Sequence, residues 1–280
     1  MRLAEAGELG LLRELERRGL AQRIEHDAAQ LAGGVVVTQD ALVEGVHFRL
    51  AWTSWRDLGY KAAAVNLSDL AASGADPEGL IVTLAAPAGT QLDDVLELYE
   101  GLNEPGVPVL GGDTTAAPLL VLSVTAIGRS ERVPGRAGAV PGDVIVVTGP
   151  LGGAAAGYAA LRDGLESEHV AAHLRPPLRL EEGKRLARVA HAMLDVSDGL
   201  ANDAAHIAAR SGVRIEIELE RVTLAAGVDE LAFGEDYELL AATPDPLDFT
   251  VIGRVVEGEG VALTLNGEPV ELAGWEHFRS

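Results

Sequence analysis

The sequence has no cysteine among its 280 residues, which excludes disulfide bonds, thiolate nucleophiles and cysteine-based zinc sites. Aromatic side chains make up only 4% of the chain, so alanine, leucine and valine must supply most of the core. No run of 18 apolar residues occurs, and we expect no membrane span. Acidic residues close to Met1 argue against a secretory signal, so a cytoplasmic location is the simplest expectation.

Positive charge is also scarce. Only two lysines, Lys61 and Lys184, are present, and the formal net charge is −21. The chain therefore lacks the basic surface that nucleic acid requires, and we expect no nucleic-acid partner. A protein that handles phosphate groups with so few lysines must neutralise them by other means. Divalent cations held by carboxylates are the obvious means, although an acidic surface also serves solubility alone.

One expected helix carries polar residues on a face that should be packed. The helix covers residues 55–73, with Ser54 as its expected cap. At 3.6 residues per turn, Lys61 and Asp69 fall on one face, and Asn66 lies beside Asp69. A buried carboxylate needs partners, and a bound cation is one that compensates it fully. The alternative is a solvated polar stripe on a surface helix.

Alternating helical and strand-like segments indicate a mixed α/β (α+β) protein of two domains. Two strand-like apolar runs end at Asp40 and at Asp195, and sites in such folds gather where strands end. Residues 132–142 are rich in glycine, proline and arginine, which is typical of a linker. We therefore expect an N-terminal domain over residues 1–137 and a C-terminal domain over residues 138–280.

Aspartates at four places in the sequence share one local pattern, in which an apolar strand or helix ends in aspartate beside glycine, serine or threonine. They are Asp27 with Asp40, Asp69, Asp113, and Asp195 with Asp198. Magnesium prefers carboxylate, hydroxyl and carbonyl oxygens, so this recurrence indicates a site for several metal ions around phosphate. Simpler interpretations are open for single members. Asp198 has the position of a helix N-cap, and Gly111-Gly112-Asp113 is typical of a tight turn.

Other catalytic motifs are weak or missing. The turn Gly149–Gly153 could hold phosphate on its backbone N–H groups, but it lacks the Gly-Lys-Ser/Thr ending of a P-loop. A plain strand-to-helix turn is therefore the preferred interpretation. No Gly-x-Ser-x-Gly motif of a serine hydrolase occurs. His26 and His47 lie near aspartates of the shared pattern, but single loop histidines are commonly surface residues.

With these motifs assembled, the chain resembles the thiamine-monophosphate kinase family. That family belongs to an ATP-binding group that includes aminoimidazole ribonucleotide synthetase and selenophosphate synthetase. The resemblance extends nearly end to end, and six segments carry it: Asp27-Ala28-Ala29, Asp40-x6-His47-Phe48, Lys61–Asp69, Gly111–Thr115, Asp195–Leu200 and Gly234–Leu239. It implies transfer of the γ-phosphoryl group of ATP to thiamine monophosphate, assisted by several Mg²⁺ ions. It also implies a homodimer, in which the N-terminal sheets of two chains join into a barrel beside sandwich-like C-terminal α/β domains.

The resemblance further implies roles for individual residues. Those that would hold magnesium are Asp27, Thr38, Gln39, Asp40, Asp69, Asp113, Asp195 and Asp198. Those that would contact the nucleotide are Tyr99, Gly112, Asp113, Arg136 and Ser197, and those that would face thiamine are His47, Glu235 and Trp275. No general base is expected, because a phosphate monoester with a second pKa near ~6 is already largely dianionic at neutral pH. The carboxylates are therefore interpreted as metal ligands, and the bound metal would reduce the repulsion between ATP and thiamine monophosphate.

The chain departs from the family pattern at His26, where an acidic residue is usual, and at Gln39, where threonine is usual. Gln39 would then bind metal through its amide or its backbone carbonyl. A ligase like aminoimidazole ribonucleotide synthetase is disfavoured because Asp195–Leu200 and Gly234–Leu239 match the kinase versions, and a selenophosphate synthetase would need an N-terminal cysteine. A metal-dependent phosphohydrolase and a non-catalytic cation-binding protein are the remaining alternatives.

Overall fold

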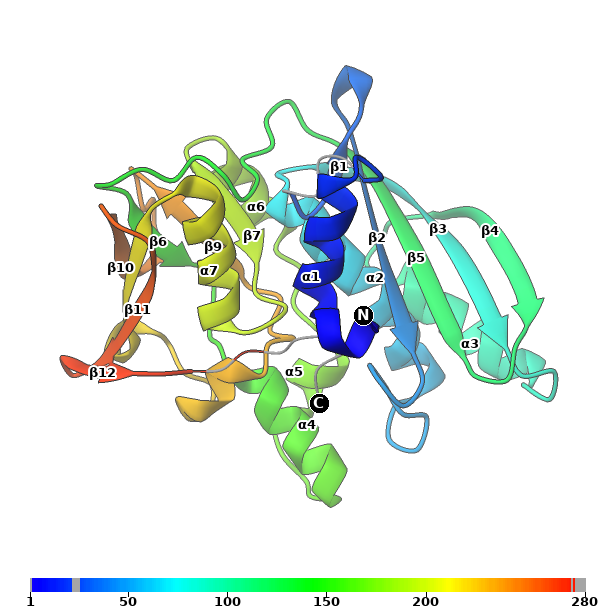
Figure 1. Cartoon of the computed structure of the whole chain (residues 1–280). Coiled ribbons are helices and arrows are strands. Elements are labelled where there is room, and N and C mark those ends of the chain that lie inside the picture. The colour runs from blue at the N-terminus through cyan, green and yellow to red at the C-terminus, as the bar shows by residue number, and fades with distance from the viewer. Residues whose placement is uncertain (1, 22–25, 273, 275–280) are drawn as a thin grey trace.

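The computed structural model describes residues 2–21, 26–272 and 274. It contains two β-sheets with their own helices, which confirms the expected mixed α/β fold of two domains (Figure 1). Each sheet has a separate core of buried apolar side chains, and a third buried cluster lies between them. Neither sheet closes into a barrel within the described residues. No helix in these ranges is both long and apolar enough to cross a membrane.

The N-terminal sheet has five strands in the order β1-β2-β5-β3-β4, in which only β3 and β4 pair in parallel. The strands are β1 Ala29–Gln30, β2 Val35–Val43, β3 Asp76–Ala86, β4 Val109–Ala116 and β5 Val121–Arg129. Helices α2 (Trp55–Ala72) and α3 (Leu92–Asn103) pack on each other, and α2 covers β2 and β5. On the opposite face of β2, alternate residues from Val35 to Ala41 are half-exposed or exposed.

The C-terminal sheet has seven strands in the order β12-β11-β8-β10-β6-β9-β7, antiparallel except where β8 pairs with β11. The strands are β6 Val144–Val147, β7 Ala192–Asp195, β8 Arg214–Glu218, β9 Leu239–Thr243, β10 Thr250–Val256, β11 Gly260–Leu265 and β12 Glu268–Val270. The remaining helices are α1 Leu3–Arg17, α4 Gly153–Asp163, α5 Val170–Leu174, α6 Leu180–Ala187 and α7 Leu200–Ser211. Short 3-10 turns lie at Ala32–Gly34, Leu219–Arg221 and Asp229–Ala232.

Helix α2 connects the two domains and runs between their sheets in Figure 1. Its small side chains let α6 cross it closely: a Cβ at Gly183 of α6 would lie 2.1 Å from the carbonyl oxygen of Ala71. Ala71 and Ala72 are buried together with Leu186 of α6 and Met193 of β7. One face of α2 therefore packs on its own sheet while its C-terminal end packs on the second domain.

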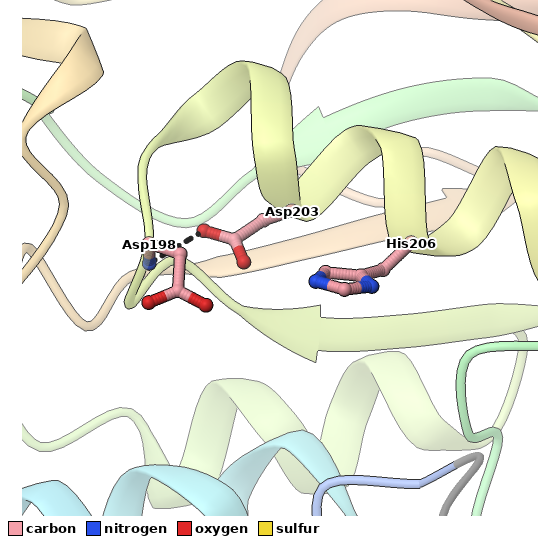
Figure 2. A group of neighbouring side chains, drawn as sticks. All are labelled: Asp198, Asp203 and His206. Carbon is pink, nitrogen blue, oxygen red and sulfur yellow. Dashed lines mark hydrogen bonds between the residues drawn. The ribbon is translucent and has the colours of Figure 1, made fainter. Parts of the chain in front are cut away.

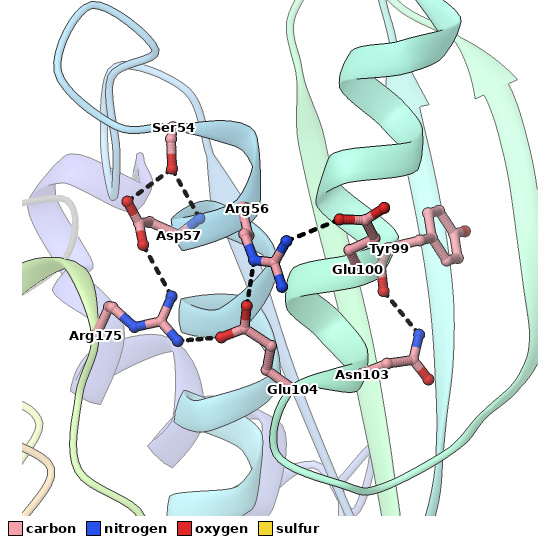
Figure 3. Close-up of polar contacts among 8 residues, drawn as sticks. All are labelled: Ser54, Arg56, Asp57, Tyr99, Glu100, Asn103, Glu104 and Arg175. Atoms are coloured by element: carbon pink, nitrogen blue, oxygen red, sulfur yellow. Dashed lines mark hydrogen bonds and ion pairs between the residues drawn. The ribbon is translucent and has the colours of Figure 1, made fainter.

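A polar network ties the domains at the other end of α2 (Figure 3). Ser54 caps the helix as expected, and its hydroxyl accepts a hydrogen bond from the Asp57 N–H at 3.0 Å. Arg175, which follows α5, lies 2.9 Å from Asp57 Oδ1, pairs with Glu104 and covers the Tyr60 ring at 4.0 Å from its centroid. Partly exposed ion pairs contribute only about 0–1 kcal/mol each. The network therefore orients the helices more than it stabilises them.

The crossing of α2 and α3 generates a prediction about stability. A Cβ at Gly59 of α2 would lie 1.9 Å from the Leu98 carbonyl oxygen of α3, and one at Gly101 would lie 2.0 Å from the Arg56 carbonyl oxygen. We expect Gly59→Ala to lower the free energy of unfolding by about 2 kcal/mol or more, because backbone must move to admit the methyl group. Chemical denaturation measures this. Gly89→Ala, where no atom lies within 4 Å, is the control and should change stability by less than about 0.5 kcal/mol. Equal stabilities of the two variants would contradict the close crossing.

Candidate active site between the domains

A cavity of about 670 Å³ is lined by residues of both domains. The N-terminal domain contributes β2, the loop that follows it and one face of α2, and the C-terminal domain contributes the segments after β7 and before β9. Most of the predicted site residues line it: Asp27, Thr38, Gln39, Asp40, His47, Asp69, Arg136, Asp195, Ser197, Asp198 and Glu235. Folding thus gathers into one cavity residues that are up to about 200 positions apart in sequence.

Strand β2 directs two of these side chains toward α2. The expectation that Asp40 ends a strand is wrong, because β2 continues beyond it to Val43. Strand alternation places Thr38 and Asp40 on one face and Gln39 on the other. There the Gln39 side-chain amide donates a hydrogen bond to the Ser123 hydroxyl at 2.8 Å. The Gln39 side chain is therefore turned away from the carboxylates, and its backbone carbonyl is the atom left to act as a ligand.

The polar face of α2 is buried, so its interpretation as a solvated stripe is wrong. The Asn66 side-chain oxygen accepts a hydrogen bond from the Asp40 N–H at 3.0 Å. The Ser68 hydroxyl donates to Asp195 Oδ2 at 2.5 Å, across the boundary between the domains. Each polar group on this face therefore holds a neighbouring acidic residue in place.

Three carboxylates come together in the cavity. Oxygens of Asp27, Asp69 and Asp195 lie within 4.8 Å of one another. The Thr38 hydroxyl donates to the Asp69 carboxylate and lies 3.2 Å from the Asp27 carbonyl oxygen. Burial, reinforced by the charge of Asp27, raises the pKa of Asp195 to about 7 and that of Asp40 to about 6. Burial and the charge of Asp40 raise the pKa of Asp69 well above its ordinary value.

Arg136, from the segment that joins the domains, supplies positive charge to this cluster. Its Nε and Nη2 atoms lie 2.8 and 2.6 Å from Asp27 Oδ1. One guanidinium offsets one carboxylate, so the others still repel each other when ionised. A divalent cation relieves this repulsion, and the carboxylate and hydroxyl oxygens present are the ligands that Mg²⁺ prefers. The residues of the cluster therefore fit the predicted magnesium site.

Asp198, Asp203 and His206 form a second group, whose ligand atoms also lie within 4.8 Å of one another (Figure 2). Asp203 Oδ2 accepts a hydrogen bond from the Asp198 N–H at 3.0 Å. The expectation that Asp198 caps the next helix is wrong, because Gly199 occupies the N-cap position of α7. Sequence analysis missed Asp203 and His206. Their separation by three positions on a helix that follows Asp198 is the signal that could have found them.

Asp113 does not join the carboxylate cluster within one chain. With Tyr99 and Gly112 it lines a separate hollow of about 500 Å³ beside the edge strand β4. The interpretation of residues 111–113 as a tight turn is wrong, because β4 runs through them in parallel with β3. A Cβ at Gly112 would lie 1.7 Å from the Val82 carbonyl oxygen, so this close pairing of strands requires glycine.

The turn Gly149–Gly153 is already occupied by a carboxylate of the chain. Asp236 Oδ2 accepts a hydrogen bond from the Gly152 N–H at 2.7 Å, and Oδ1 accepts one from the Ala154 N–H at 3.1 Å. Burial raises the pKa of Asp236 to about 6. The N–H groups that would cradle a phosphate are thus used internally, which supports the interpretation as a plain strand-to-helix turn.

Two of the three residues predicted to face thiamine line the cavity, namely His47 and Glu235. The third, Trp275, lies outside the described residues. Glu235 pairs with Lys61 of α2 and with His173 of α5. The sequence indicates Lys61 on the polar face of its helix but not its partner, and it contains no local signal for His173.

Comparisons with known proteins show which sequences and structures the chain resembles. Models of the AIR synthase related protein family match the chain over residues 25–130 (N-terminal domain) and 140–266 (C-terminal domain). The thiamine-monophosphate kinase of Aquifex aeolicus is 35% identical, over 99% of this chain and 100% of the relative. That of Escherichia coli K12 is 37% identical, over 87% of this chain and 86% of the relative. Among solved structures, AaThiL complexed with AMPPCP and TMP has a TM-score of 0.92 at 35% identity, with 99% of each chain covered.

The raised pKa values generate a prediction about magnesium and pH. Because the folded-state pKa of Asp195 is about 7 and its ordinary value is 3.8, the cluster stabilises the fold below about pH 4, and this stability is lost as pH rises through 7. Mg²⁺ binds the ionised carboxylates, so its stabilising effect grows over the same range. We expect saturating Mg²⁺ to raise Tm by about 5 °C or more at pH 8, and by much less at pH 5.5.

Thermal unfolding with and without MgCl₂ measures this effect. Asp195→Asn should abolish most of the difference between the two pH values, whereas Asp93→Asn, at an exposed position of α3, should preserve it. An increment that is equal at both pH values would show that these carboxylates do not bind the ion.

Proposed function

Because the chain belongs to the AIR synthase related family and, within it, to the thiamine-monophosphate kinases, we infer that it transfers the γ-phosphoryl group of ATP to thiamine monophosphate. The products are thiamine diphosphate and ADP. The observation that carries this function is the meeting of Asp27 and Asp69 with Asp195 in one cavity between the domains. The similar AaThiL structure is a complex with AMPPCP, an analogue of ATP, and with TMP. Two phosphorylated substrates can meet only where their charges are neutralised.

Magnesium is the proposed neutralising ion. Bound ions would offset the charge of the phosphates and align the γ-phosphoryl group for in-line transfer. The residues proposed to hold them in this chain are Asp27, Thr38, Asp40, Asp69, Asp195 and Asp198, with Gln39 through its backbone carbonyl. Other residues keep these ligands in position: Ser68 binds the Asp195 carboxylate, and Asn66 fixes the backbone at Asp40. These hydrogen bonds limit the movement of the proposed metal ligands, and phosphoryl transfer depends on the distance between the reacting atoms.

The two ends of the cavity suit the two substrates. Ser197 and Arg136 lie beside the carboxylate cluster, where they are proposed to contact the nucleotide. His47 and Glu235 are proposed to contact the acceptor, together with Trp275. No residue has to remove a proton, because the acceptor phosphate is already largely dianionic at neutral pH. The chain's part is therefore to bind, orient and exclude water.

A homodimer with a shared barrel accounts for the residues that lie outside the cavity. Strand β4 is an edge of its sheet, and Leu110 on it is 60% exposed. Ile81 on the neighbouring strand β3 is 39% exposed. Edge strands with free backbone groups pair readily with another chain. The proposal therefore gives the hollow lined by Tyr99, Gly112 and Asp113 to the nucleotide of the second subunit.

Two further proposals concern the domain boundary and the cellular location. A domain boundary at residues 137/138 is supported by the two separate cores, which contain residues 28–126 and 139–263. The absence of cysteine supports a cytoplasmic location.

A metal-dependent phosphohydrolase is the competing function, because the same carboxylates could serve attack by water. We expect ADP release to require thiamine monophosphate and to match thiamine diphosphate formation mole for mole. Coupled detection of ADP, with chromatography of the thiamine products, measures both. Equal ADP release without the acceptor would identify a hydrolase.

The metal-holding role of Asp69 generates a further prediction. We expect Asp69→Asn to lower turnover by about 100-fold or more, because one ligand charge next to the phosphates is lost. The fold should remain intact, since an asparagine oxygen can still accept the Thr38 hydrogen bond. Circular dichroism and unfolding curves test the fold, and ADP release tests turnover. Asp163→Asn, at the exposed end of α4, is the control and should keep full activity. An active Asp69→Asn enzyme would refute the role.

A further inference from the structure

Lys61 is a lysine in an unusual place. Its side chain is 1% exposed, in the middle of helix α2, whose buried residues are mostly alanine, leucine and valine. A buried ammonium group is unfavourable unless a partner compensates it. The partner is Glu235 of the other domain, whose Oε2 accepts a hydrogen bond from Lys61 Nζ at 3.0 Å. The pair joins residues 174 positions apart and lies in the wall of the active-site cavity.

A second polar side chain lies close to the Glu235 carboxylate without the geometry of a hydrogen bond. His173 Nδ1 lies 3.1 Å from the same Oε2 that Lys61 contacts. Burial alone would raise the pKa of Glu235, but Lys61 and His173 outweigh it and hold the pKa at about 2. Burial also lowers the pKa of His173, so this imidazole is neutral at neutral pH. Neither contact uses Oε1, which is the oxygen left to a ligand.

The backbone at Glu235 has an unusual conformation. Its φ of 56° is in the left-handed region, which side chains other than glycine rarely adopt, and Tyr237 shares it with a φ of 52°. The Glu235 N–H donates to the Ser197 carbonyl oxygen at 2.9 Å, which ties this segment to the loop that follows Asp195, the last residue of β7. Backbone held in such conformations is typical of functional sites.

Aromatic rings line the same cavity as the carboxylate. Tyr158 and Phe233 stack with ring centroids 5.1 Å apart, and Trp52 meets Tyr158 edge-on at 6.2 Å. All three line the cavity with Glu235. A carboxylate beside aromatic faces suits a flat nitrogen heterocycle that carries N–H donors or positive charge. This is the chemistry of the non-phosphate part of the proposed acceptor.

We propose that Lys61 is a positioning residue for acceptor binding: its ammonium group holds Oε2 of Glu235 and leaves Oε1 to face the heterocycle of the acceptor. The proposal rests on the proposed kinase function. In this proposal Lys61 acts on Glu235 and not on the phosphate groups, although it lies two helical turns from Asp69 on the same face of α2. The competing view is that the Lys61–Glu235 pair only fastens the domains together.

The proposal is tested by measuring the Michaelis constants of Lys61→Met for thiamine monophosphate and for ATP. We expect the KM for thiamine monophosphate to rise about tenfold or more, while the KM for ATP and kcat at saturating acceptor change less than about twofold. The matched control is Lys184→Met, which removes the other lysine, a surface residue of α6 paired with Asp76 and Glu181. It changes the net charge equally and should leave every constant as in the wild type.

A double-mutant cycle distinguishes positioning from fastening. If Lys61 acts through Glu235, then Lys61→Met adds no further increase in acceptor KM to a chain that already carries Glu235→Gln. The double variant should also regain thermal stability lost by Lys61→Met, because it buries no unpaired charge. It thereby supplies a folded protein if the single variant does not fold.

The outcomes are separable. An unchanged acceptor KM in folded Lys61→Met, or increases that multiply in the double variant, would overturn the positioning role. An ATP KM that rises together with the acceptor KM would assign Lys61 to fastening the domains. Failure of the wild-type protein to form thiamine diphosphate would instead overturn the proposed function itself.

Discussion

Mutual repulsion among buried and half-buried carboxylates is the constraint on which this structure depends. Asp27, Asp69 and Asp195 bring like charges within 4.8 Å, and Asp40 adds another nearby. Hydroxyl groups donate hydrogen bonds to Asp69 and Asp195, and the Asn66 side-chain oxygen accepts one from the Asp40 N–H, but these bonds cannot cancel the charge of the carboxylates. The scarcity of lysine in the chain fits this arrangement, because ammonium groups beside the cluster would compete with the divalent cations that it is proposed to bind.

Helix α2 makes that concentration of charge possible. It faces β2 on one side and β7 on the other, so one rigid element supports acidic residues of both domains. Asn66 reaches Asp40 in the first sheet, and Ser68 reaches Asp195 at the end of a strand in the second. Alanine and glycine elsewhere on α2 allow close crossings with α3 and α6. Short contacts across small residues fix the distance between the domains and therefore the size of the site.

The sequence predicts this site better than it predicts the elements that carry it. The Ser54 cap, the polar face of α2 and Asp195 at a strand end follow from local spacing, and the structure contains all three. Asp40 inside a long strand and β4 through residues 111–113 could not be foreseen, because pairing with distant strands extends them past their local turn signals. The Glu235–Lys61 pair depends on how two domains dock, which local spacing does not encode.

The same docking gives the cavity two electrostatically different ends. At one end, the carboxylates outnumber the nearby guanidinium of Arg136, and the surplus charge attracts cations. At the other end, Lys61 offsets the charge of Glu235, so that carboxylate keeps its hydrogen-bonding oxygen but has little net charge with which to attract an ion. Without Lys61, Glu235 would become one more carboxylate available to metal in the same cavity. The buried lysine therefore leaves Glu235 less able to attract an ion than the carboxylates of the cluster are.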